Sequence, residues 1–74
     1  MGDKYPILTP REIISKLCSL GFEYKSQKGS HIKYVKDGNP KRTVIIPNHD
    51  TVARGTLKSI LEQANIDLND FLHR

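Results

Sequence analysis

The spacing of the apolar residues changes twice along this chain, and these changes limit the possible fold more than any other feature. Between Ile13 and Leu20 the apolar residues recur at three- and four-residue intervals, which is the period of a helix. The preceding segment Thr9-Pro10-Arg11-Glu12 has the pattern of a capping box with proline in the first turn. We therefore expect a helix to begin after Thr9 and to end at Gly21.

From Phe22 onward apolar and polar residues alternate, which is the period of a strand. We expect the first strand to end in a turn at Lys28-Gly29-Ser30, and a second strand to cover residues 31–36. The Asp37-Gly38-Asn39-Pro40 cluster is typical of a hairpin turn. A third strand over residues 42–46 should end before Pro47, so the strands are predicted to form an antiparallel meander.

Helical spacing returns near the end of the chain, at Leu57, Ile60, Leu61 and Ala64. We expect Thr56 to be the N-cap of this helix and Asn65 to end it. Asp67 is expected to cap a short last helix that carries Leu68, Phe71 and Leu72. The predicted fold is α+β with the order α-β-β-β-α-α. Helices with one apolar face each should share one side of the sheet and leave the other side to solvent or a partner.

The chain has 74 residues and is predicted to be one domain, with a leader over residues 1–8 and a core region over residues 9–74. The leader is expected to be either a strand that contacts a partner or a disordered end. Cys18 should lie in the core, and as the only cysteine it excludes an internal disulfide. The aromatic residues expected in the core are Phe22, Tyr24, Tyr34 and Phe71.

The sequence has no zinc-type ligand spacing, no signal peptide pattern and no apolar run that could span a membrane. We therefore expect a cytoplasmic protein without a metal or another cofactor.

Positive charge is concentrated in the middle of the chain. Residues 25–58 contain eight bases and two acids, a net charge of +6, whereas residues 1–24 sum to zero and residues 59–74 to −2. A basic segment between neutral and acidic ends is typical of a surface that binds a polyanion such as a nucleic acid. The same lysines could also serve only to solvate an open sheet face.

One histidine lies among these bases. If Ile32 and Tyr34 face the helices, alternation places His31 and Lys33 together on the open face, roughly 6 to 7 Å apart along the strand. A histidine can accept a proton near pH 7, so it could deprotonate a ribose 2′-hydroxyl for attack on the adjacent phosphate without a metal. Tyr34 should face away, which leaves Lys28, Lys33 or water as the acid. A histidine at a sheet edge is also commonly a surface residue without catalytic function, and the residues alone leave both interpretations open.

Four segments occur here in a characteristic order: K-L-C-S-L-G-F, K-G-S-H, V-I-I-P-N-H and R-G-T-L-K-S-I-L. With these segments the chain resembles, over about residues 12–71, the HicA toxins of bacterial and archaeal toxin–antitoxin pairs. The resemblance implies a fold like that of double-stranded-RNA-binding domains. It also implies the activity of an mRNA interferase, an endoribonuclease that cuts mRNA.

In that family the histidine of the G-S-H motif is catalytic, so the resemblance implies this role for His31, with Gly29 and Ser30 as its supporting turn. His49 resembles the histidine that commonly follows the third-strand proline. Contact with RNA, contact with the antitoxin and capping of the next helix all remain open for His49. The other residues expected to contact RNA are basic: Lys25, Lys28, Lys33, Arg54 and Lys58.

The resemblance also implies a partner, a HicB-type antitoxin that binds the basic face and covers His31. Two alternatives to the enzyme remain. One is a non-catalytic RNA-binding module of the double-stranded-RNA-binding type, and the other is a domain whose basic face binds only an acidic protein.

Overall fold

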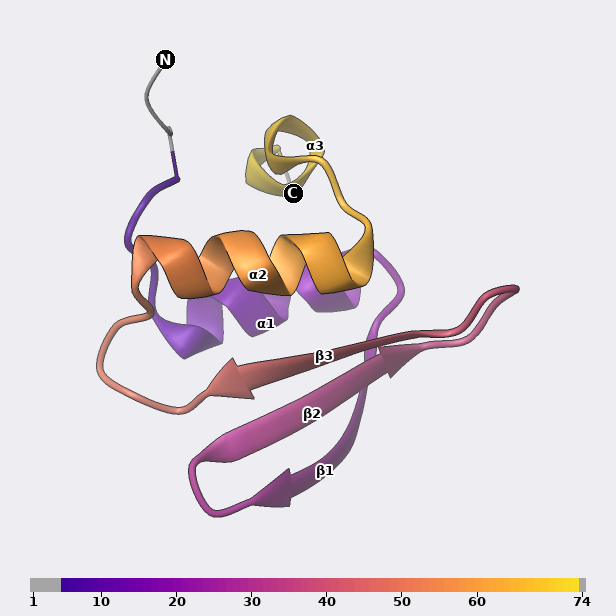
Figure 1. Cartoon of the computed structure of the whole chain (residues 1–74), viewed down its shortest axis with the longest axis horizontal. Coiled ribbons are helices and arrows are strands. Elements are labelled where there is room, and N and C mark those ends of the chain that lie inside the picture. The colour runs from indigo at the N-terminus through magenta and orange to yellow at the C-terminus, as the bar shows by residue number, and fades with distance from the viewer. Residues whose placement is uncertain (1–4, 74) are drawn as a thin grey trace.

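Three helices and three strands follow one another in the predicted order in a computed structural model that describes residues 5–73 (Figure 1). The elements are α1 (Pro10–Ser19), β1 (Glu23–Lys28), β2 (His31–Lys36), β3 (Arg42–Pro47), α2 (Arg54–Ala64) and α3 (Leu68–Leu72). The α+β fold class and the element order are thereby confirmed. No helix in the described part of the chain is long and apolar enough to cross a membrane.

The ends of α1 follow from its local sequence. Thr9 accepts a hydrogen bond from the Glu12 backbone N–H at 3.2 Å, and the Glu12 carboxylate accepts one from the Thr9 N–H at 2.8 Å. This is the predicted capping box, with Pro10 at the first helical position. The helix ends before Gly21, whose φ of +100° lies in the region that favours glycine.

The sheet has the order β1-β2-β3, and both pairs are antiparallel. Ile32 and Tyr34 of β2 are buried, whereas His31 and Lys33 are exposed, so one face is covered and the other is open. The predicted alternation along β2 is confirmed.

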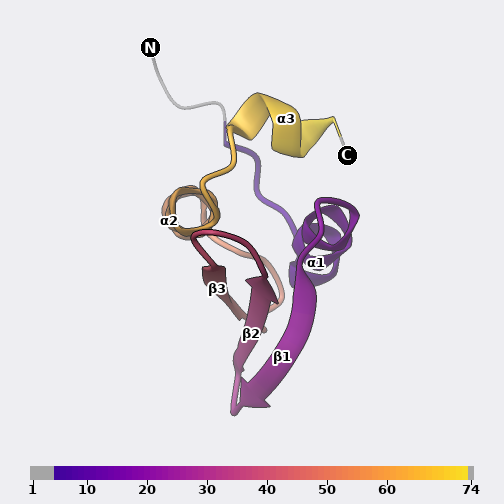
Figure 2. The ribbon, with the colours of Figure 1, turned by 90° about the vertical axis from the view of Figure 1, so that its right-hand side faces the viewer.

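The helices lie on one side of the sheet (Figure 2). There α1 and α2 lie side by side, and α3 lies beyond them, farther from the strands. The core between sheet and helices contains Ile13, Leu17, Phe22, Ile32, Tyr34, Val44, Ile46, Val52, Leu57, Ile60, Leu61, Ala64 and Phe71.

Two residues expected in the core are exposed. Cys18 is exposed because the buried line of α1 runs through Pro10, Ile13 and Leu17, and Cys18 lies beside it. Tyr24 is 58% exposed because it belongs to edge strand β1, which has no buried residue and an irregular register after Tyr24. Its ring packs edge-on against Tyr34, with the ring centroids 5.9 Å apart. The predictions for these two residues were wrong.

The start of α2 also differs from the prediction. Ala53, and not Thr56, is the N-cap, and it makes no side-chain cap hydrogen bond. The Val52 N–H donates to the Leu8 carbonyl at 2.8 Å, and Arg54 Nε donates to the Tyr5 carbonyl at 2.9 Å. These contacts fix the chain where it enters α2, so tertiary structure and not a capping side chain sets the first residue of the helix.

The leader is ordered where it is described. Tyr5 and Leu8 pack against the core, and Leu8 forms an isolated antiparallel bridge with Val52. Residues 5–8 therefore contact the rest of the domain, while residues 1–4 lie outside the described residues. At the other end, the predicted caps are confirmed: Asn65 ends α2 in the left-handed conformation, and the Asp67 carboxylate accepts the Asn69 N–H at 3.1 Å.

Candidate active site

A two-residue turn joins β1 to β2 and places Lys28 directly opposite His31 in the ladder. Gly29 has a φ of +59°, and a positive φ at the first of two turn residues is the pattern of a type II′ hairpin. The turn is held at both residues. The Gln27 side-chain amide donates to the Gly29 carbonyl at 3.0 Å, and the Asn48 N–H donates to the Ser30 carbonyl at 2.7 Å.

The open face of the sheet carries two rows of side chains that cross all three strands. In the first row His31 lies between Lys28 of β1 and Pro47 of β3. In the second row Lys33 lies between Ser26 and Ile45. Side chains directly opposite in an antiparallel pair have Cβ atoms about 4.5–5.5 Å apart, so Lys28 lies beside His31 on the neighbouring strand. Lys33 lies beside His31 on the same strand, two residues further along β2.

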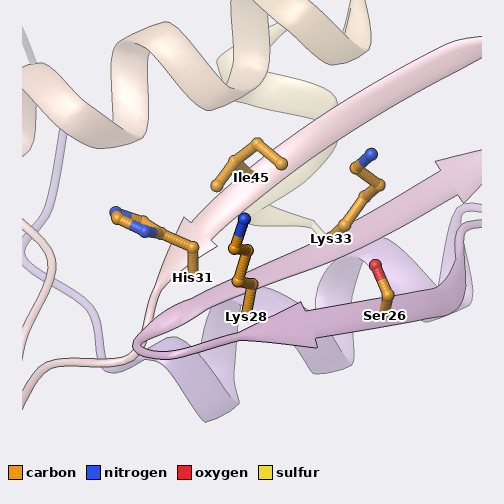
Figure 3. A pocket seen from close by; sticks show the side chains of 5 residues that line it. All are labelled: Ser26, Lys28, His31, Lys33 and Ile45. Carbon is orange, nitrogen blue, oxygen red and sulfur yellow. The ribbon is translucent and has the colours of Figure 1, made fainter.

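Five of these residues line one open hollow of about 560 Å³, namely Ser26, Lys28, His31, Lys33 and Ile45 (Figure 3). In Figure 3 the two lysines extend from neighbouring strands on the face that α1 does not cover. His31 lies at the end of the hollow beside the β1–β2 turn. The structure thus brings together the predicted residues Lys28, His31 and Lys33.

His31 also lines a second hollow, of about 400 Å³, on the side toward α2. That hollow contains the other predicted histidine, His49, together with Ile45, Pro47, Thr51, Val52, Ala53 and Thr56. The imidazole of His31 therefore lies where two adjoining hollows meet, with the lysines in one and a second imidazole in the other.

The hydrogen bonds of the three histidines differ. His73 Nδ1 lies 2.7 Å from the Asn69 carbonyl oxygen, within the last turn of the chain. Among the described residues neither His31 nor His49 has a hydrogen-bond partner, so both rings are available to a ligand. His49 does not cap α2, which removes one of its three expected roles.

Tyr34 cannot act as a catalytic group on the open face of the sheet. Its side chain is 8% exposed and lies on the helix side of β2. Burial, with smaller contributions from Cys18 and Tyr24, raises the pKa of the Tyr34 phenol above its ordinary value. The phenol is therefore neutral at physiological pH and directed away from His31, as expected.

The remaining predicted residues lie apart from these hollows. Gly29 and Ser30 form the turn, and exposed Lys25 lies at the irregular position of β1. Arg54 and Lys58 are exposed on the first turns of α2, where Arg54 is already bonded to the leader.

Two residues that line the first hollow, Ser26 and Ile45, were not among the predicted site residues. Ile45 could have been found, because a buried Val44 and Ile46 on either side direct it to the open face. Ser26 could not, because its pairing depends on the irregular register of β1. Within residues 5–73, no cluster of three or more His, Cys, Asp or Glu side chains could hold a metal ion.

Comparison with known families links this chain to a family of toxins. A family model described as the HicA toxin of bacterial toxin–antitoxin systems matches residues 10–66, which include all three strands and most of the core. A search of curated protein sequences finds no match. The matched region contains every residue that lines the two hollows.

Proposed function

The chain belongs to the HicA toxin family and is thus the toxin of a toxin–antitoxin pair, and we propose that it cuts mRNA with His31 as general base. The observation that carries this proposal is the position of His31. It is exposed on the open face, lacks a hydrogen-bond partner among the described residues, and lies opposite Lys28 with Lys33 two residues further along.

The proposed reaction is a transesterification within the RNA. His31 accepts the proton of a ribose 2′-hydroxyl, and the 2′-oxygen forms a bond to the adjacent phosphorus. The bond from phosphorus to the 5′-oxygen of the next nucleotide breaks. The products are a 2′,3′-cyclic phosphate and a 5′-hydroxyl. A 2′-hydroxyl is required, so DNA is not a substrate.

Lys28 and Lys33 stabilise the negative charge that gathers on the phosphate oxygens during this attack. Both ammonium groups line the same hollow as His31, so one phosphate can contact all three. Lys25, Arg54 and Lys58 lie farther out and contact the RNA backbone on either side. These contacts supply affinity without reading sequence.

The partner of this toxin is an antitoxin. We propose that a HicB-type antitoxin covers the open face of the sheet, because that face carries the His31 hollows and the partner must block them to inhibit. The central segment has a net charge of +6, so the covering surface is expected to be acidic. With mRNA as its substrate, the free toxin acts in the cytoplasm.

Cleavage of an end-labelled single-stranded RNA, with EDTA present and a matched DNA control, tests this function. We expect the wild-type chain to cut RNA only, and His31→Ala to lose about 100-fold or more of the rate while keeping its affinity for RNA. His73→Ala is the matched control, because His73 is bonded within α3 and lies outside both hollows.

Two results would contradict the catalytic role. If both proteins bind RNA and neither cuts it, the chain is an RNA-binding module. If His31→Ala cuts as fast as the wild type, another residue is the base. A chain with no salt-dependent RNA affinity would instead be a protein-interaction domain.

A further inference from the structure

The base proposed above removes a proton from the attacking oxygen, but the departing 5′-oxygen must also receive one. Tyr34 is excluded because it is buried on the other face of β2. An alkylammonium group is ordinarily a much weaker acid than an imidazolium, so the lysines are poorly suited to this transfer. The second hollow beside His31 contains a better group.

His49 lies near His31 because the chain that leaves β3 after Pro47 stays beside the β1–β2 turn. His31 pairs with Pro47, and beyond that pair the Asn48 N–H donates to the Ser30 carbonyl at 2.7 Å. His49 follows Asn48 in the bend after β3 and lines the same hollow as His31. The hollow of about 400 Å³ between them could hold a phosphate group that contacts both imidazoles.

Three observations agree with such a pair. Both histidines line one hollow, and both side chains are exposed. Neither ring has a hydrogen-bond partner among the described residues, in contrast to His73. The hollow that they share adjoins the one with Lys28 and Lys33, so a phosphate next to His31 can contact lysines on one side and His49 on the other.

We propose that His49 is a second catalytic residue, the general acid for the leaving group. This inference rests on the ribonuclease function proposed above. As the 2′-oxygen attacks and the phosphorus–oxygen bond breaks, the protonated His49 ring donates its proton to the departing 5′-oxygen. His31 has gained a proton and His49 has lost one, so the reaction is balanced and needs no metal or other co-reactant.

The test uses two RNA oligonucleotides that differ in one atom. In one of them, sulfur replaces the bridging 5′-oxygen at the cleavage position. A thiolate leaves without needing a proton, so this substrate does not depend on a general acid. We expect His49→Ala to cut the oxygen substrate about 100-fold or more slowly than the wild type does. On the sulfur substrate, its rate should lie within about tenfold of the wild-type rate. His49→Gln, which keeps a polar side chain, is expected to behave in the same way.

Two controls separate this inference from the function on which it rests. His31→Ala should cut both substrates slowly, because the attacking hydroxyl needs a base in either case. His73→Ala should cut both at the wild-type rate. If the wild type does not cut the oxygen substrate, the proposed function itself fails. If the wild type cuts and His31→Ala does not, but the His49 variants slow both substrates equally or slow neither, the general-acid role alone is overturned.

Discussion

Gly29 and Gly55 show how one backbone angle decides the effect of a substitution. An added Cβ would meet no atom within 4 Å at either position, so crowding is the same for both. Gly29 has a φ of +59°, which disfavours side chains, whereas Gly55 lies inside helix α2. Substitutions at these two residues therefore measure how much the conformation of the turn that places Lys28 opposite His31 contributes to the free energy of unfolding.

We predict opposite effects of the same methyl group. Gly29→Ala should lower the free energy of unfolding by roughly 1–2 kcal/mol, because an L-residue is strained at positive φ. Gly55→Ala should raise it by roughly 0.5–1 kcal/mol, because alanine is favoured within a helix. Urea denaturation of the two variants measures both values. Equal changes for the two variants would mean that the conformation of the turn does not constrain residue 29.

Single residues also show where the sequence was sufficient and where it was not. His31 and Lys33 could be assigned to the open face because alternation along β2 requires only two buried neighbours, Ile32 and Tyr34. Cys18 and Tyr24 could not be assigned correctly. Their burial depends on how far the helices extend over the sheet edge and on the width of the packed stripe of α1, and neither is encoded in the spacing of apolar residues.

At the level of the elements, α1 depends on a local signal that can be removed. Thr9→Ala deletes the side-chain oxygen that accepts the Glu12 N–H. We predict that it lowers the free energy of unfolding by about 1 kcal/mol. Because α1 lies behind the sheet, the rate of RNA cleavage by the folded variant should not change. Ser15→Ala, at an exposed position within the same helix, is the control and should not lower stability, because alanine is the better helix former.

A loss of cleavage by folded Thr9→Ala, measured well below its unfolding temperature, would contradict the separation of α1 from the active site. If Thr9→Ala is as stable as Ser15→Ala, the capping box does not stabilise the start of the helix.

The ends of the helices could be predicted where nearby residues set them, and could not be predicted where contacts with distant residues set them. The start of α1, the end of α2 and the cap of α3 each depend on residues within one turn of the boundary. The start of α2 depends instead on Leu8 and Tyr5, which bind Val52 and Arg54 from more than 40 positions away in the sequence. The same long-range contacts direct the loop that carries His49. The hollow shared by the two histidines was therefore beyond the reach of the sequence analysis.

In the whole molecule, the packed core and the proposed active site lie on opposite faces of one thin sheet. The chain extends over 33 × 28 × 17 Å, and its core lies between the helices and one face of the sheet. The other face carries two lysines of the basic central segment, Lys28 and Lys33, beside His31. One surface is therefore proposed to bind RNA and to be blocked by the antitoxin, so the two ligands should exclude each other.

That a ribose 2′-hydroxyl is the nucleophile, as the proposed role of His31 requires, can be tested by mass spectrometry of the RNA ends that the wild-type chain produces. The substrates are an RNA with one cleavage position and the same RNA with a 2′-O-methyl group at that position. We predict a 2′,3′-cyclic phosphate and a 5′-hydroxyl from the first RNA, and no cleavage of the second. Cleavage of the methylated RNA, or products with a 5′-phosphate and a 3′-hydroxyl, would show that the 2′-oxygen is not the nucleophile and that His31 does not act as proposed.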